Sequence, residues 1–247
     1  MDELELIKRK LNDLSSASFN RNTWEYSKFL NMEEQSELTI ARMPSDYFLF
    51  GGYDSAERCI AVFGNEDDIG YPCYPPINYI EVTPLNEKFA DSLTHRDFLG
   101  ALMSLGINRD MLGDILVSNS SAVIICMDSV ADYIISELDK IKHTSVKCRI
   151  IDSVPEIAKP EFKYEELIVS SERIDVIISG IYNLSRNESQ SLIKGEKIFC
   201  DSRAVLSSSF IPKNGQTVSV RGKGRFIYDG ILRETKKGRY VIAVKKY

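Results

Sequence analysis

The chain has 247 residues, of which 43% are hydrophobic and 27% charged, which is the composition of a globular protein with one large domain or several small ones. Its net charge is −5, yet residues 171–247 hold 15 lysines and arginines against 7 acids, while the preceding residues hold 16 against 29. This asymmetry argues against indiscriminate nucleic-acid binding by the whole chain and indicates a basic module attached to acidic ones.

The first residues are charged, so we expect no signal peptide, and no apolar run reaches the roughly 20 residues that a membrane helix needs. The five cysteines are Cys59, Cys73, Cys126, Cys148 and Cys200. They are odd in number and never at CxxC spacing, which argues against a disulfide framework or a zinc site. We therefore expect a cytoplasmic protein with reduced thiols, no metal, no cofactor and no membrane contact.

The beginning of the chain predicts a small domain of helices and strands. Apolar residues at helical spacing predict an amphipathic first helix, and residues 46–52 and 58–64 predict two strands joined by a loop. The segment 71–76, rich in proline and aromatic residues, interrupts regular structure. We therefore expect an N-terminal α+β domain over residues 1–72.

Residues 73–152 predict strand, helix, strand, strand, helix and strand, at 77–85, 94–105, 114–117, 122–127, 129–142 and 145–151. This βαββαβ order is that of ferredoxin-like and RNA-recognition (RRM-like) folds. RNA-recognition sheets stack bases on aromatic side chains of their central strands, and the candidate third strand at 122–126 has none. We expect the fold class without its usual stacking platform.

The tripeptide His-Arg-Asp at 95–97 matches the start of a protein-kinase catalytic loop. That loop needs an Asn five residues after the Asp, where this chain has Leu102, and no Asp-Phe-Gly follows. The stretch is better explained as a helix start, with Thr94 as cap, Asp97 in the first turn and Gly106 at the end. Since no nucleophile elbow or phosphate loop is found elsewhere, we expect a non-enzymatic protein.

The basic part of the chain follows a segment at 153–169 whose prolines and mixed charges predict a linker. Residues 170–247 then predict two helices with Ser171 and Ser185 as caps, a strand at 198–200, and a later strand that runs into a basic turn. The last residues predict a hairpin with lysines and an arginine at its tip. The overall fold class is therefore α+β, with three modules.

The two helices and the strand after them carry a recognisable order of residues. Arg-x-Asp, Ser-Arg, Leu-Ile and a basic residue before a strand occur at Arg173 and Asp175, Ser185 and Arg186, Leu192 and Ile193, and Lys197. This order resembles the S-four type (alpha-L) RNA-binding domain, which implies an RNA-binding module. The chain departs from that pattern at Ser189, usually Ala, at Glu196, usually Gly, and at Asp201-Ser202, usually Asn-Gly.

Longer motifs point to one family. "HRDFLGALMSLGINRDMLGDI", "VRGKGRF" and "ETKKGR" occur in this order, and with them most of the chain after Gly70 resembles the YlmH family of bacterial RNA-binding proteins. The resemblance implies a cytoplasmic, non-enzymatic protein encoded near cell-division genes. It also implies binding to rRNA and tRNA on the large ribosomal subunit, in ribosome-associated quality control of stalled peptidyl-tRNA.

The candidate RNA-binding residues all lie in the basic module. Arg186 would stand at a helix start, where the dipole and amide groups favour phosphate. The full set is Arg173, Ser185, Arg186, Lys194, Lys197, Arg203, Arg221, Lys223, Arg225, Lys236, Lys237 and Arg239. We expect these residues of a monomer to contact the large ribosomal subunit, through its rRNA and with peptidyl-tRNA as a further ligand.

Two other functions stay open from the sequence. One is an RNA-modifying enzyme similar to pseudouridine synthases, because Arg173-Ile174-Asp175 looks like the Arg-Leu-Asp context of their catalytic Asp, although residues 206–247 are too few for a catalytic domain after it. The other is a scaffold protein of cell division, whose basic face would bind an acidic partner.

Overall fold

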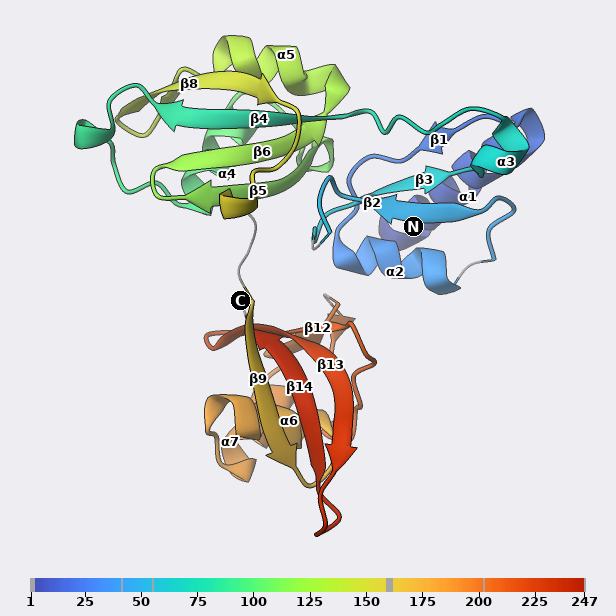
Figure 1. Ribbon diagram of the computed structural model, residues 1–247, viewed down its shortest axis with the longest axis vertical. Coiled ribbons are helices and arrows are strands. Elements are labelled where there is room, and N and C mark those ends of the chain that lie inside the picture. The colour runs from blue at the N-terminus through green and yellow to red at the C-terminus, as the bar shows by residue number, and fades with distance from the viewer. Residues whose placement is uncertain (1–2, 41, 55, 159–161, 202, 247) are drawn as a thin grey trace. The chain divides into compact units, whose positions relative to one another are not determined.

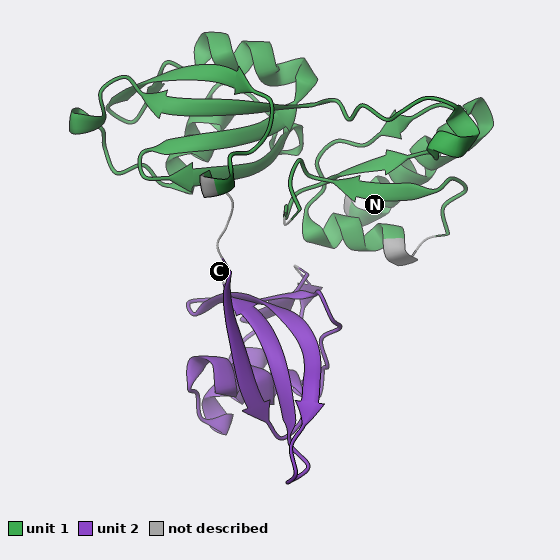
Figure 2. Cartoon of the chain, viewed as in Figure 1, with its two compact units in different colours: residues 1–160 green, residues 161–247 purple. Residues whose placement is uncertain are grey.

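The protein is described from a computed structural model that covers every residue except 1–2, 41, 55, 159–161, 202 and 247 (Figure 1). Contacts divide the chain into two compact units, unit 1 at residues 1–160 and unit 2 at residues 161–247 (Figure 2). Within the described residues, no helix is both long and apolar enough to cross a membrane. The division of unit 1 between residues 72 and 73 stays a prediction.

Unit 1 begins with a small sheet that two helices cover on one face. Its elements are α1 (Glu3–Arg21), β1 (Glu25–Tyr26), α2 (Met32–Ile40), β2 (Tyr47–Phe50), β3 (Ile60–Phe63) and α3 (Glu66–Ile69), with strand order β1-β3-β2. Leu11 of α1 and Leu38 of α2 pack on Phe63 of β3 in one buried cluster. The expected first helix and the two expected strands are confirmed, whereas β1 and α2 were not predicted.

The second part of unit 1 has the expected βαββαβ order. Its main elements are β4 (Ile77–Pro84), α4 (His95–Ser104), β5 (Leu112–Ser118), β6 (Ser121–Met127), α5 (Asp128–Glu137), β7 (Lys140–Ile141) and β8 (Thr144–Ile151). The strands are antiparallel in the order β5-β6-β4-β8-β7, and one core cluster joins α4 and α5 to the sheet. Single turns of 3-10 helix lie at Glu87–Phe89, Arg109–Met111 and Glu156–Ala158.

The second helix of this part is shorter than expected. It ends at Glu137 instead of continuing to Lys142, because β7 folds back on β8 through a tight turn in which Lys142 has a positive φ of 53°. A helix cannot continue through a left-handed residue, and the pairing of Ile141 with Thr144 takes the backbone groups that the helix would use.

The kinase-like tripeptide is a helix start. The Thr94 N–H and hydroxyl both donate to Asp97 Oδ2, at 2.8 and 2.7 Å, and Gly106 ends the segment with a φ of 81°. Lys142 Nζ lies 2.7 Å from the same carboxylate, and this ion pair with the Thr94 bonds lowers the pKa of Asp97 to about 2. Asp97 is therefore committed to a cap and an ion pair.

A half-buried carboxylate joins the two parts of unit 1. Asp114 of β5 accepts hydrogen bonds from the Glu57 and Arg58 amides at 2.7 and 3.1 Å and from the Tyr53 hydroxyl at 2.8 Å. The Arg58 guanidinium donates to carbonyls of Leu112 and Phe29 nearby, at 3.0 and 3.1 Å. These bonds hold the loop between β2 and β3 on the edge strand β5, so the two parts share a polar joint.

Unit 2 is an antiparallel sheet with two helices on one face. Its elements are β9 (Lys163–Val169), α6 (Ile174–Tyr182), α7 (Arg186–Lys194), β10 (Ile198–Cys200), β11 (Arg203–Ala204), β12 (Thr217–Val220), β13 (Gly224–Glu234) and β14 (Tyr240–Lys246). The strand order is β11-β10-β12-β13-β14-β9, and Figure 1 shows β9, β14 and β13 in front of α6 and α7. Isoleucines of α6, at 174, 177 and 178, are fully buried against the sheet, as expected.

Two expectations for this unit are wrong. Residues 163–169 form β9 instead of part of a linker, because they pair with β14 along their whole length and alternate between the core and solvent. Helix α6 begins at Ile174 with Arg173 as its cap residue, not at Ser171, since the Ile174 amide donates to the Phe210 carbonyl at 2.8 Å. The expected cap of α7 at Ser185, the strand at 198–200 and the final hairpin are confirmed.

The structure shows how the chain accommodates its departures from the S-four pattern. Ser189 is fully buried, and its hydroxyl bonds the Ser179 hydroxyl at 2.6 Å and the Ser185 carbonyl at 3.1 Å. Glu196 and Asp201 both have left-handed backbones, with φ of 50° and 45°, while Ser202 lies outside the described residues. Glycine and asparagine adopt that conformation more easily than other residues. The backbone of Glu196 is therefore strained at a position where the S-four pattern has Gly.

Replacing Glu196 by glycine is expected to stabilise unit 2 by roughly 0.5–1 kcal/mol, because the left-handed penalty removed exceeds the entropy that glycine adds to the unfolded chain. Slower hydrogen exchange of the α7 and β10 amides in the variant than in the wild type would measure this gain in stability. Glu234→Gly, in β13 where φ is not positive, is the matched control and should destabilise the sheet. Faster exchange in the Glu196→Gly chain would contradict the prediction.

Candidate RNA interface

A shallow depression of about 330 Å³ opens beside the first turns of α6 and α7. It is lined by Ser170, Ser171, Arg173, Asp175, Val176, Ser179 and Arg186. Two of the residues expected to bind RNA, Arg173 and Arg186, therefore share one surface, although they come from different helices.

Arg173 is held by its own neighbour. Its Nε and Nη2 donate to the two carboxylate oxygens of Asp175, at 3.0 and 2.7 Å, and this pairing raises the pKa of Arg173. The Asp175 side chain is 3% exposed and that of Arg173 37%. The pair fixes the start of α6 and leaves only part of the guanidinium for a ligand. It also hides the aspartate of the pseudouridine-synthase look-alike from any substrate.

Arg186 is the first residue of α7 and is exposed. The helix start beside it is already capped, because the Glu188 amide donates to Ser185 Oγ at 3.2 Å and Glu188 Oε2 accepts from the Ser185 amide at 2.7 Å. These bonds lower the pKa of Glu188, so a negative charge stands where phosphate was expected to meet free amides. The anion-binding group at this end is therefore the Arg186 side chain more than the helix terminus.

The turn between β12 and β13 brings further basic side chains to this end of the unit. Lys223 lies close enough to Glu188 for its charge to lower the pKa of that carboxyl. The Arg221 amide donates to the Lys197 carbonyl at 2.8 Å, which places these two residues side by side. We call Arg186 and Lys223 the helix-start cluster; both are exposed, as are Lys197, which follows the end of α7, and Arg221 beside it.

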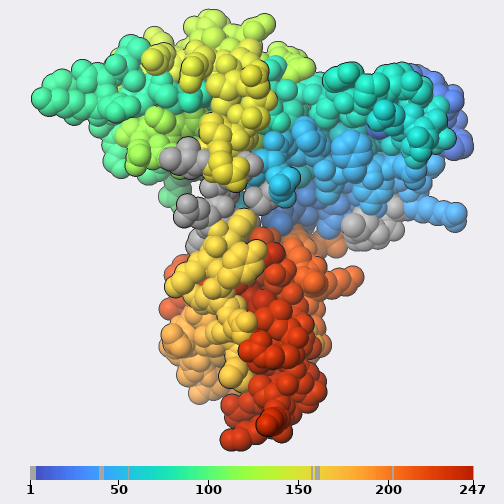
Figure 3. Space-filling view, in the orientation of Figure 1, coloured from blue at the N-terminus to red at the C-terminus, as the bar shows by residue number. Residues whose placement is uncertain are grey.

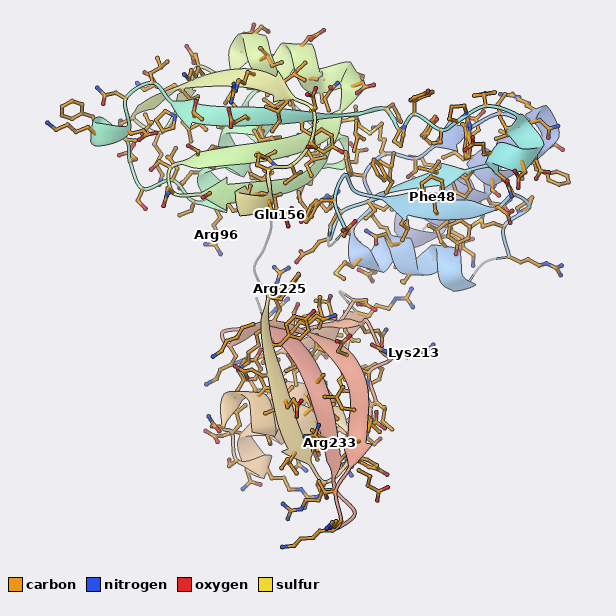
Figure 4. All side chains as sticks on the ribbon, in the orientation of Figure 1. Phe48, Arg96, Glu156, Lys213, Arg225 and Arg233 are labelled. Carbon is orange, nitrogen blue, oxygen red and sulfur yellow. The ribbon has the colours of Figure 1, made fainter. Side chains whose placement is uncertain are left out.

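Lys194 and Arg203 are exposed as well, the first in the last turn of α7 and the second in β11 opposite Cys200. Arg225 is exposed near the start of β13, and Figure 4 shows it at the end of the unit away from the final hairpin tip. The cap Ser185 has its hydroxyl engaged with the Glu188 amide, so its role is to shape α7.

The hairpin tip, made of Lys236, Lys237 and Arg239, is a separate basic surface. All three side chains are exposed on a turn closed by the Thr235 amide, which donates to the Arg239 carbonyl at 2.7 Å. Strand β13 has 11 residues and separates this tip from Lys223 in the β12–β13 turn by roughly 30 Å, at about 3.3 Å per residue. The structure therefore separates the hairpin tip from the basic residues of the β12–β13 turn.

The central sheet of unit 1 offers no stacking platform on β6, as expected. Its neighbour β4 does carry Tyr79, but the hydroxyl of that ring donates to the Gly52 carbonyl at 3.1 Å and the ring packs in the core between the two sheets. Beside it, Arg149 Nε is 2.5 Å from the Glu81 carboxylate. All five cysteines are free, and the described residues contain no cluster of side chains that could hold a metal ion.

Comparison with known proteins identifies the family of this chain. Residues 77–154, which span β4 to β8, match the family model described as the putative RNA-binding domain in YlmH. The ribosome-associated protein quality control protein P2 of Bacillus subtilis (strain 168) is 30% identical over 226 residues, covering 88% of this chain and 85% of that protein. The chain belongs to the YlmH family. A solved structure of the cell division protein ylmH from Streptococcus pneumoniae is 21% identical, with a TM-score of 0.47, over 61% of this chain and 92% of that one.

Sequence reasoning about this YlmH-family chain missed two aromatic residues of unit 2 that accompany basic side chains. Phe199 lies beneath Arg221, with 4.6 Å between Cζ and the ring centroid, and Tyr164 lies beneath Lys245, with 5.3 Å between Nζ and the centroid. Tyr164, Glu166 and Ile168 stand at every second position, as on one face of a strand, and this spacing was the sequence signal for β9. The prolines before these residues, however, favoured a linker.

Arg173→Ala and Arg186→Ala are expected to separate a structural arginine from a binding one. Removing Arg173 leaves the buried Asp175 carboxylate without its two charged donors, so the thermal unfolding midpoint of unit 2 should fall by several degrees. Removing the exposed Arg186 should leave it unchanged. Differential scanning calorimetry of the full chain checks this, and equal midpoints in both variants would contradict it.

Proposed function

We propose that this protein is a non-enzymatic RNA-binding factor that docks on the large ribosomal subunit and acts in ribosome-associated quality control. Its ligands would be rRNA and the peptidyl-tRNA of a stalled complex, bound by a cytoplasmic monomer. The observation that carries the proposal is the helix-start cluster, in which exposed basic side chains from the first turn of α7 and the β12–β13 turn lie near one another. The name of the Bacillus subtilis relative supports the ribosomal setting.

The chemistry of these residues suits structured RNA. Lysine and arginine side chains contact phosphates and release counterions, which gives affinity without base sequence and positions a protein by the shape of the RNA. The two basic ends of unit 2, roughly 30 Å apart along β13, would contact phosphates of separate RNA segments. Unit 1 is acidic and would not add to this attraction.

The mechanism that follows is selective stabilisation. A ligand shifts an equilibrium only by its unequal affinity for the two states, so the protein would favour the ribosome–tRNA arrangement in which both basic ends find phosphate. No group transfer is needed for this action.

Arg186→Glu is expected to lower the affinity for the large subunit by about tenfold or more, because charge reversal places repulsion where a phosphate contact is proposed. Co-sedimentation of the purified protein with ribosomal subunits, at low and moderate salt, measures this. Lys213→Glu is the matched control, since Lys213 is exposed on the same unit outside both basic surfaces (Figure 4).

If the folded Arg186→Glu chain travels with the large subunit as wild type does, the site assignment is wrong. If the wild type travels with no subunit, the ribosomal proposal fails. Nuclease treatment distinguishes RNA from an acidic protein partner, because only a complex that depends on RNA would dissociate when the RNA is degraded.

Neutralising the hairpin tip, with glutamine at 236, 237 and 239, should reduce the salt dependence of binding. Each phosphate contact contributes close to one unit to the slope of log K against log salt, so the slope should become shallower by up to about 3. Affinities for the large subunit at several salt concentrations measure the slope. An unchanged slope would show that the tip does not touch phosphate.

A further inference from the structure

Unit 2 has a second surface that the helices leave open. Alternation along the strands sends one set of side chains into the core under α6 and α7 and the other set to the opposite face, here called the outer face. The inward set includes Ile198, Val218, Val220, Phe226, Tyr228, Ile242 and Val244, all nearly inaccessible. In Figure 3 the atoms of β9, in yellow, and of β13 and β14, in red, lie at the surface on this side.

Strand register places a continuous row of residues across this outer face. Phe199 of β10 pairs with Ser219 of β12, and Ser219 pairs with Arg225 of β13. Two residues along β13, Ile227 pairs with Lys245 of β14, which pairs with Tyr164 of β9. With about 4.8 Å between neighbouring strands, the row from Phe199 to Tyr164 is roughly 20 Å long.

Each end of the row has an aromatic ring with a cation beside it. The Arg221 guanidinium lies 4.6 Å from the centre of the Phe199 ring, and Lys245 Nζ lies 5.3 Å from the centre of the Tyr164 ring. Tyr164 is 67% exposed. Lys245 also contacts Asp229 at 3.1 Å, which raises the pKa of Lys245 and holds the ammonium beside the ring.

The row has a boundary on the side toward the hairpin tip. Arg233 of β13, labelled in Figure 4, and Glu166 of β9 form an ion pair at 2.9 Å, and since β14 lies between their strands, this pair spans Val241 and Ala243. Those two residues are buried although they face outward. The Arg233–Glu166 pair therefore separates the end that carries the rings and cations from Ile168, which is 64% exposed beyond it.

Flat aromatic faces next to lysine and arginine are the features by which proteins hold unpaired nucleotides, because every base has a face that stacks and every phosphate attracts a cation. A duplex cannot use such rings, since its bases are already stacked on one another. An acidic peptide would need the cations but not the exposed tyrosine. RNA with unpaired bases therefore fits this surface best.

We propose that the outer-face row, formed by Phe199, Arg221, Arg225, Lys245 and Tyr164, binds unpaired RNA nucleotides by stacking bases on Tyr164 and on the Phe199–Arg221 pair. The proposal rests on the proposed function, and it adds the class of RNA that a second face of unit 2 takes. The helix-start cluster would hold the phosphates of a folded RNA, and the outer-face row would hold bases of an adjoining single strand.

Fluorescence anisotropy of the full-length chain with two probes tests this. One probe is a short labelled oligouridine, and the other is a labelled RNA hairpin with a stable duplex stem and a tight loop. Tyr164→Ala should weaken oligouridine binding about tenfold, from the usual effect of removing one stacked base, and leave hairpin binding unchanged. Tyr164→Phe, which keeps the ring, should bind like wild type.

Two further variants make the result specific. Arg221→Lys keeps the charge but loses the planar group that stacks on Phe199, so it should also weaken oligouridine binding. Phe89→Ala is the matched control, because Phe89 is 77% exposed in unit 1 and has Lys88 Nζ 5.7 Å from its ring centre. It should bind both probes like wild type.

The proposal is overturned if the wild type does not bind oligouridine, if Tyr164→Ala binds it unchanged, or if Phe89→Ala loses as much affinity. It is also overturned if Tyr164→Ala weakens both probes equally. Failure of the proposed function has a different signature, since then the wild type would not travel with the large subunit or Arg186→Glu would not lower hairpin affinity. Circular dichroism of each variant checks that the chain is folded.

Discussion

The register of β14 between β13 and β9 is the constraint on which unit 2 depends. It places Ile242 and Val244 under α6 and α7 and turns Lys245 to the outer face. A slip by one residue would exchange the two sets, because neighbouring side chains of a strand point to opposite faces. Two side chains of this size stabilise the fold by about 1.5–3 kcal/mol each when fully buried, so the core selects one register. The same choice lines up the rings and cations outside.

Two arginines at neighbouring helix starts show how context divides one residue type between structure and binding. Arg173 meets a carboxylate two residues later and becomes part of the scaffold, with both oxygens of Asp175 engaged. Arg186 stands next to a capping box whose acid, Glu188, is bonded to Ser185, so its own charge faces solvent. The Arg-x-Asp and Ser-Arg pattern of these helices therefore contains one arginine that stabilises the fold and one whose charge is exposed to a ligand.

The acidic unit 1 is held together by a polar joint between its two parts. Asp114 accepts hydrogen bonds from two amides and a hydroxyl of the β2–β3 loop. The Arg58 guanidinium donates to carbonyls in both parts of unit 1. Half-buried charges with this many hydrogen-bond partners are costly to separate, which keeps the two parts of the unit together. The sheet that matches the family's putative RNA-binding domain has its one central tyrosine bonded to Gly52.

The sequence by itself determined the features whose bonds lie within a few residues. The caps at Thr94–Asp97 and Ser185–Glu188, the βαββαβ order and the final hairpin follow from local hydrogen bonds and from hydrophobic spacing, and the expectations for them are confirmed. Only the tertiary structure decided that residues 163–169 are a strand, because their partner β14 is more than seventy residues away. It also decided that Phe199 supports Arg221 and that the hairpin tip stands apart from the other basic residues, since those relations depend on strand register and strand length.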